Sequence, residues 1–180
     1  TMSWAVTPAG SAPSTVIARN GVEYTLEGHD ITVVPGRSLQ IGPVRGQGRP
    51  HDEGGVFPVF TMAGRWSARG DDDLRFEAAE LDLGDLRRVF APRGPVLAGR
   101  ADVRVDLGGD LDTHPRFAAE GVVYDGNFAG LEGANLAFFV GYDASQLTIQ
   151  GQLDLDRGGR FNLAGRGDFS ASLATFMEAA

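Results

Sequence analysis

The chain repeats itself at a fixed spacing of 87 residues. Residues 61–66 align with residues 148–153, and the same spacing places Leu74 on Phe161. The copies share few identities; what they share is apolar type and the position of glycines. A fixed period indicates one supersecondary unit that packs against a copy of itself. Such arrays usually bind or span and seldom catalyse, so the repeat favours a binding or scaffolding role.

The spacing extends to a predicted loop and a predicted helix. It aligns residues 41–46 with 128–133, and residues 86–90 with 173–177. Within 86–90 the apolar residues recur at i, i+3 and i+4, and Asp85 precedes them as the expected cap. We therefore expect a leader over residues 1–13, a first β repeat over 14–93 and a second over 94–180. Each repeat is expected to end in a short helix.

Composition restricts the class of protein. The 180 residues are 42% hydrophobic and 22% charged, which is typical of a globular chain. The net charge of −8 argues against binding to nucleic acid and against docking on an anionic membrane surface. No cysteine is present, so the sequence offers no disulfide framework and no thiolate metal site. No run approaches the roughly 18 apolar residues of a membrane span, and any anchor or signal is expected outside this segment.

Most of the sequence has the alternation of half-buried β-strands. Between residues 97 and 107 the odd positions are apolar or small and the even ones mostly charged. Two dipeptides, Asn20-Gly21 and Asp125-Gly126, predict hairpin turns because both residue types tolerate positive φ. Turns are also expected at 70–73, 108–115 and 156–159, and a loop at 43–55. Each repeat is thus predicted to be an antiparallel meander with one apolar and one polar face.

An antiparallel sheet of this kind must hide its apolar face. It can do so as a β-sandwich or barrel with a packed core. It can also form a curved sheet whose apolar face lines a groove for an apolar ligand. The residues alone leave both alternatives open.

The order of several short motifs resembles the repeats of the TamB and AsmA-type proteins. The motifs are a short helix over 83–90, the Leu97-Ala98-Gly99 strand start, the Leu107-Gly108-Gly109-Asp110-Leu111 strand end and the proline in 114–117. The closing segment over 153–167 is similar to the end of that repeat. The resemblance covers residues 57–180 well and residues 14–56 weakly.

This resemblance implies a mainly β fold: a curved, elongated antiparallel sheet, the U-shaped "β-taco", with an apolar concave groove. It implies a part of a periplasmic, envelope-spanning protein that carries phospholipid between the inner and outer membranes. The full protein would be held in the inner membrane by a segment outside this one. Some members also act in outer-membrane protein assembly with a barrel of the Omp85 class. The alternative is a structural or interaction β-solenoid with a closed core and no lipid cargo.

A groove of this kind would act without bond chemistry. Drawing a 16-carbon tail through water costs on the order of 12 kcal/mol, at roughly 0.8 kcal/mol for each CH₂. A continuous apolar track removes that barrier. The side chains expected to contact phospholipid or fatty-acyl chains are Trp66, Phe76, Leu97, Val103, Val105, Leu107, Phe117, Val123, Leu147, Ile149, Leu153, Leu155, Phe161, Leu163 and Phe169.

Other candidate sites have simpler explanations. The acidic run 71–73 lacks the spaced ligands of a calcium loop and is expected to be a solvated turn. His29, His51 and His114 lack metal-ligand spacing, and no nucleophile elbow or phosphate loop is present. We therefore expect no catalytic residues, no metal and no cofactor. The open ends of the predicted sheet also predict end-to-end self-association.

Overall fold

The computed structural model describes residues 3–6, 15–19, 22–28, 31–34, 38–48, 58–67, 72–90, 97–110, 114–128, 131–143 and 145–168. Within these ranges the chain forms strands and one helix. In chain order they are β1 (Ser3–Val6), β2 (Thr15–Arg19), β3 (Val22–Glu27), β4 (Ile31–Val34), β5 (Ser38–Gly48), β6 (Val59–Ser67), β7 (Asp72–Asp82), α1 (Leu83–Phe90), β8 (Leu97–Asp110), β9 (His114–Phe128), β10 (Leu131–Asp143), β11 (Gln146–Leu155) and β12 (Arg160–Asp168).

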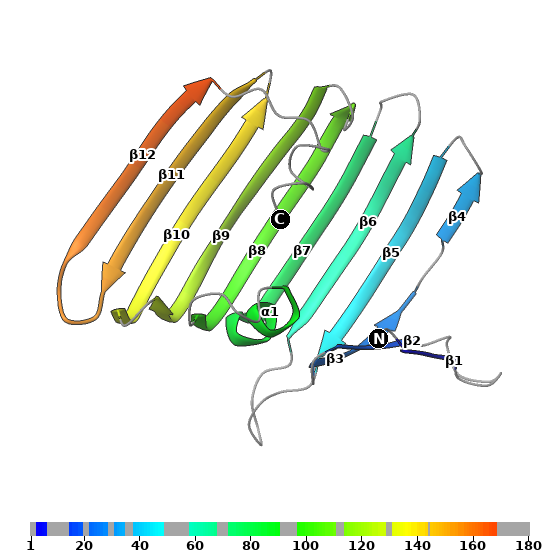
Figure 1. The fold of residues 1–180 in the computed structure, drawn as a ribbon, viewed down its shortest axis with the longest axis horizontal. Helices are drawn as coiled ribbons and strands as arrows, with labels where there is room; N and C mark the ends of the chain where they lie inside the picture. Colours follow the sequence, from blue (N-terminus) through cyan, green and yellow to red (C-terminus); the bar gives the residue numbers. More distant parts are fainter. Residues whose placement is uncertain are drawn as a thin grey trace.

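The described strands form a single antiparallel sheet. Its order follows the chain from β5 to β12, with β1, β2 and β3 joined beyond β5, and β4 paired with the outer part of β5. Strands β4 to β12 make the broad surface of the sheet, and α1 lies against one end of it (Figure 1). The prediction of a mainly β, antiparallel meander is confirmed. The pairing of β7 with β8 runs across the predicted repeat boundary, so both predicted repeats share this sheet.

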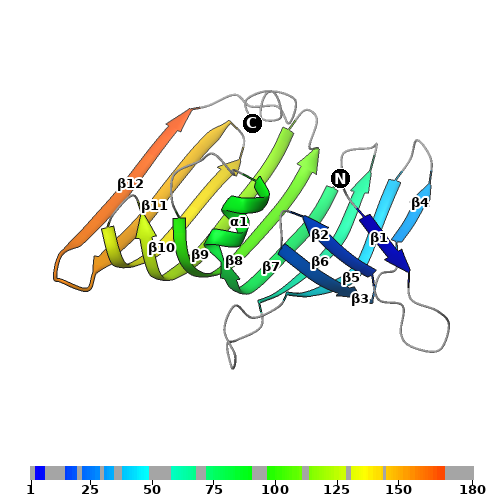
Figure 2. The same cartoon turned by 60° about the horizontal axis from the view of Figure 1, so that its bottom comes forward.

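The sheet is neither closed nor strongly curled. The described strands therefore curve less than the expected U-shaped sheet. What bends is one end of the sheet, where β8, β9 and β10 turn toward α1 (Figure 2). The described residues therefore present an open surface with one raised border.

A line of irregular residues coincides with this bend. The strand registers shift between Ala78 and Leu81, between Ala98 and Arg100, and on both sides of Ala134. Residues near these shifts have positive φ: Glu80, Gly99, Asp125 and Gly133. An extra residue in one strand bends that strand and increases its twist. Bulges at the same level of neighbouring strands therefore account for the common bend.

Several of the best-buried residues lie at the bent end. Leu81 on β7, Ala101 on β8 and Val123 on β9 are 4%, 0% and 4% exposed and stand opposite one another across the strands. Helix α1 packs against β7, β8 and β3 beside them. Among the described residues no large side chain is below 2% exposed. Val44 on β5 and Ala119 on β9 are also buried, at 3% and 8% exposed, in the row of Phe76 and Val105. The core is therefore small, and it extends from the corner beside α1 into the middle of the sheet.

The predicted short helix is present, but its cap is one turn earlier than expected. The backbone N–H of Asp85 donates to Oδ1 of Asp82, 2.8 Å away, so Asp82 is the N-cap of α1. Asp85 instead lies inside the first turn, where its carboxylate pairs with Arg88. An acidic residue three positions after the cap also favours the positive end of the helix dipole. The predicted helix over 173–177 lies outside the described residues.

Part of the predicted loop at 43–55 is a strand. Residues 43–48, expected in a loop, continue β5, because Gly46 leaves room for the Phe60 ring: a Cβ there would lie 2.2 Å from it. Pro43 fits because the register shifts between Ile41 and Val44, where a missing N–H is tolerated. The glycine and proline residues of this segment predicted a loop, although the segment is a strand. The rest of the predicted loop, residues 49–55, lies outside the described residues.

The Asp125-Gly126 pair is not a hairpin turn, because β9 continues through it to Phe128. Asp125 has φ of 51°, and the positive φ that such pairs tolerate serves a bulge instead. The predicted turn at 108–115 is narrower than expected, since Asp110 already pairs with His114. The turn at 156–159 and the hairpin that pairs Arg19 with Val22 are confirmed. Residues 3–6, expected in the leader, form β1 on the edge of β2.

The repeat survives as a pattern of faces. The spacing of 87 aligns β6 with β11 and Thr61 with Thr148. Thr61 pairs with Glu77, and Thr148 pairs with Arg166, on the same face of the sheet. The partners are 89 residues apart, a slip of two that keeps every side chain on its face. The proposed match of 41–46 with 128–133 is wrong, because β5 corresponds to β10, which begins at Leu131 and pairs with β11.

Candidate functional site

One face of the sheet is apolar from β5 to β12. Residues directly opposite each other in an antiparallel pair lie on the same face, so the registers define rows that cross the strands. Four such rows are Ile41, Gly64, Leu74, Leu107, Phe117, Tyr142, Leu147 and Gly167; Val44, Met62, Phe76, Val105, Ala119, Val140, Ile149 and Gly165; Gly46, Phe60, Ala78, Val103, Gly121, Phe138, Gly151 and Leu163; and Leu81, Ala101, Val123, Leu136, Leu153 and Phe161. We call this surface the apolar face.

The rows are long enough to form a continuous track. Eight strands at a spacing of about 4.8 Å span roughly 34 Å at right angles to the strands. Aromatic side chains are packed along the track, with ring centroids of Phe60 and Phe76 5.7 Å apart and those of Tyr24 and Phe60 5.5 Å apart. No charged side chain occurs in the four rows. The apolar face is therefore a hydrophobic strip that runs across the strands.

Nearly all of the sequence-predicted groove residues belong to the apolar face. It carries Phe76, Val103, Val105, Leu107, Phe117, Val123, Leu147, Ile149, Leu153, Phe161 and Leu163. Trp66 pairs with Leu39, Leu155 pairs with Ala134 and Leu97 pairs with Phe128, at the ends of the same strands. Phe169 lies outside the described residues.

The exposure of these residues divides the face into three zones. At the bent end Val123 and its neighbour Ala101 are buried, so they belong to the core. In the middle, residues such as Val105 and Ile149 are half-buried. On β12, Phe161 and Leu163 are 59% and 64% exposed. The middle and the β12 border are the zones that a ligand can contact.

Sequence reasoning missed the apolar residues of β5 and β10 and part of those of β6 and β7. Leu136, Phe138 and Val140 complete the rows between β9 and β11, and Met62 extends them. The adjacent Phe138 and Phe139 hid the alternation, because one ring is on each face. The apolar residues at alternate positions, Leu136, Phe138, Val140 and Tyr142, are the signal that could have identified this strand's part of the apolar face.

Glycines shape the floor of the apolar face near β12. A Cβ added at Gly165 or Gly167 would meet no atom within 4 Å, so these positions are open. Gly121 differs, because a Cβ there would lie 2.5 Å from the backbone oxygen of Asp102 and 3.0 Å from the Phe138 ring. The apolar face is therefore open at the β12 edge and closely packed at Gly121 on β9.

The opposite face is held by ion pairs. Asp106 on β8 accepts from Nε of Arg75 at 2.7 Å and from Nε of Arg104 at 2.9 Å. The hydrogen bond from Arg75 lowers the pKa of the Asp106 carboxyl below its ordinary value, with Arg104 adding to it. On β12, Arg160 lies 2.6 Å from Asp154, and this hydrogen bond lowers the pKa of Asp154. These groups are solvated, so this face stays hydrated and the ion pairs stabilise the strand pairing only weakly.

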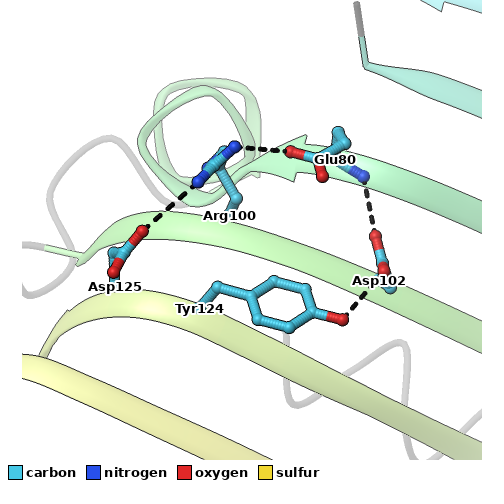
Figure 3. A network of polar contacts seen from close by, with 5 residues as sticks. All are labelled: Glu80, Arg100, Asp102, Tyr124 and Asp125. Carbon is cyan, nitrogen blue, oxygen red and sulfur yellow. Dashed lines mark hydrogen bonds and ion pairs between the residues drawn. The ribbon is translucent and has the colours of Figure 1, made fainter. Parts of the chain in front are cut away.

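A polar network crosses the bend on the same face (Figure 3). Arg100 bridges Glu80 at 3.0 Å and Asp125 at 3.3 Å. Asp102 accepts from the backbone N–H of Glu80 at 2.9 Å and from the Tyr124 hydroxyl at 3.0 Å. The bond to Asp102 raises the pKa of the Tyr124 phenol. The network joins the bulged residues of β7 and β9 on the polar face of the bend.

The described hollows open mainly on the polar face. One of them has a volume of about 930 Å³ and is lined by side chains that include Arg75, Asp106, Phe139 and Thr148. Its mixed lining and open shape offer no convergent set of catalytic groups. In the described ranges, no cluster of three histidine or acidic side chains could hold a metal ion.

No helix among the described residues is long and apolar enough to cross a membrane. Comparisons of the sequence and the fold with protein-family models, curated proteins and solved structures give no match. The apolar face is thus the feature of the described residues that indicates a function.

Proposed function

We propose that this chain is a section of a lipid conduit, in which acyl chains lie along the apolar face. The observation that carries the proposal is the continuous set of apolar rows from β5 to β12, with charged and polar side chains on the other face. Removing apolar surface from water is favourable at roughly 25 cal/mol for each Å². A flat, uncharged strip supplies that gain at every point along its length without chemical steps.

The distribution of burial supports a ligand better than a closed core. A closed core would bury large side chains, whereas Val105, Ile149 and Leu153 are only half-buried. Phe161 and Leu163 at the border are mostly exposed. Exposed apolar patches of this extent usually mark interaction surfaces. The alternative of a structural β-solenoid without cargo has no comparable support among the described residues.

The resemblance to TamB and AsmA-type repeats gives the proposal its setting. It suggests a periplasmic, envelope-spanning protein that moves phospholipid between two membranes, with its inner-membrane anchor outside this segment. The finer shape, a U-shaped sheet around the lipid, and the contact with an Omp85-class barrel belong to the proposal for the full protein. In that protein the bent end beside α1 would form one wall of the groove.

The first test is a comparison of lipid binding by paired variants. Ile149→Asp places a carboxylate in the middle of the apolar face, and Thr148→Asp places the same group on the polar face of the same strand. We expect native mass spectra of the parent chain and of Thr148→Asp to show bound phospholipid. Ile149→Asp should lose at least tenfold in affinity for a fluorescent fatty acid, because a charge would have to lose its water to contact an acyl chain.

The fold supplies the control for this test. Ile149→Asp should remain folded by circular dichroism, since the carboxylate can reach water from a half-buried position. Ala101→Asp should unfold the domain, since that residue is 0% exposed. If Ile149→Asp unfolds the protein as Ala101→Asp does, the face is a closed core. If all folded variants bind fatty acid equally, the apolar face is not the lipid site.

A further inference from the structure

Strand β12 is an edge strand whose sequence is complementary to itself. It ends the described sheet after β11, and every residue from Arg160 to Asp168 is exposed. An exposed edge presents unpaired backbone N–H and C=O groups to a further strand. The side chains of β12 determine which strand can pair with this edge.

Two antiparallel copies of β12 centred on Ala164 place complementary side chains opposite each other. On the polar face Arg160 of one copy faces Asp168 of the other, twice by symmetry. On the apolar face Leu163 faces Gly165, and Phe161 faces Gly167. Opposite charges on facing residues stabilise a strand pair.

The space for this arrangement is present. Gly165 and Gly167 have no atom within 4 Å of an added Cβ, so both can receive the exposed Leu163 and Phe161 of another copy. Arg160 already pairs with Asp154 at 2.6 Å, yet it is 65% exposed and can reach a second carboxylate. Arg100 binds two carboxylates in this way, Glu80 and Asp125, in the same sheet.

We infer that β12 pairs with β12 of a second copy of this chain, antiparallel and centred on Ala164. The pair joins two sheets into one and makes their apolar faces continuous. This inference depends on the edge strand alone and does not require that the face binds lipid. Because a two-fold contact closes on itself, it produces a dimer and not an open fibre.

The sharpest test uses single cysteines, because the chain has none of its own. In Ala164→Cys the two sulfurs meet at the two-fold axis, where facing Cα atoms are about 4.5 to 5.5 Å apart, within disulfide range. Asn162→Cys lies on the same face of the same strand, but its two copies are roughly 13 Å apart. We expect rapid oxidation of Ala164→Cys to a disulfide dimer and at least tenfold slower dimer formation by Asn162→Cys.

A charge exchange tests the register without cysteine. Asp168→Arg alone and Arg160→Asp alone each place like charges opposite each other, and we expect self-association at least tenfold weaker in sedimentation equilibrium. An equimolar mixture of the two should associate again, because each Arg then faces an Asp. Equal cross-linking by both cysteine variants, assembly into species larger than dimers, or failure of the mixture to associate would overturn the inference.

Discussion

At the scale of single residues, the two faces of the sheet rely on different physics. Burial of an apolar residue such as Val105 lowers the free energy of the folded protein, and the size of this effect depends on what covers the side chain. A residue such as Asp106 is solvated and gains from directed hydrogen bonds to Arg75 and Arg104. Surface pairs of this kind contribute little to stability, and they respond to pH. The polar face can therefore be tested by titration.

We expect the Asp106 carboxyl to titrate at a lower pH than an ordinary aspartate, because the hydrogen bond from Arg75 favours its charged form. Its folded pKa lies below its unfolded value of about 3.9. The stabilisation is therefore present above the unfolded pKa and is lost as the pH falls through the folded pKa. Carbon-detected NMR titration of the carboxyl checks the midpoint.

The matched variants for this titration are Arg75→Ala and Arg157→Ala. The first removes the donor to Asp106 and should raise the midpoint toward the ordinary value. The second removes an exposed arginine from the β11–β12 turn and should leave it unchanged. An unchanged midpoint in Arg75→Ala would show that the pair is not formed in solution.

At the scale of elements, the bend depends on α1 and on the bulges beside it. The helix has only eight residues, so it cannot be stable in isolation and depends on its cap and its packing. Asp82 supplies the cap, and Tyr24 of β3 lies near the same end. Burial, with a smaller effect of Asp85 and Asp82, raises the pKa of the Tyr24 phenol. The corner of α1 and β3 is thus one packed unit.

Asp82→Ala should lower the free energy of unfolding by about 1 kcal/mol, because the N–H of Asp85 loses its acceptor. Asp82→Asn keeps a capping oxygen and should lose much less. Urea unfolding followed by circular dichroism measures both. Equal losses in the two variants would mean that the charge of Asp82 matters and its cap does not.

Alternation over 97–107 predicted β8 and its faces correctly, because one half-buried strand has a period of two. The prediction of loops and turns from glycine and aspartate was wrong at two places. Gly46 makes room for the Phe60 ring within a strand, and Asp125 lies in a bulge and not in a turn. Positive φ and small size are needed in turns, bulges and close contacts alike. The bend could not be predicted, since it depends on several bulges at one level.

At the scale of the whole molecule, the sheet is an open surface with a packed corner, a half-buried middle and an exposed border at β12. This gradient is what the proposed lipid conduit requires: a surface that an acyl chain can contact and an edge that a further strand can extend. The sequence predicted the members of the apolar face on β8, β9, β11 and β12, where alternation is clean, but missed those of β5 and β10 and part of those of β6 and β7. The sequence could not predict the depth of the groove, which depends on how far the strands curl.

The most direct test of the central claim is to locate a bound acyl chain. The protein is incubated with a fatty acid that carries a photoreactive diazirine, irradiated and digested, and the labelled residues are identified by mass spectrometry. We predict labels on the middle of the apolar face, at Val105, Val140, Ile149 and their neighbours in the same rows. Labels spread evenly over both faces, or confined to the polar face around Phe139 and Thr148, would contradict the account.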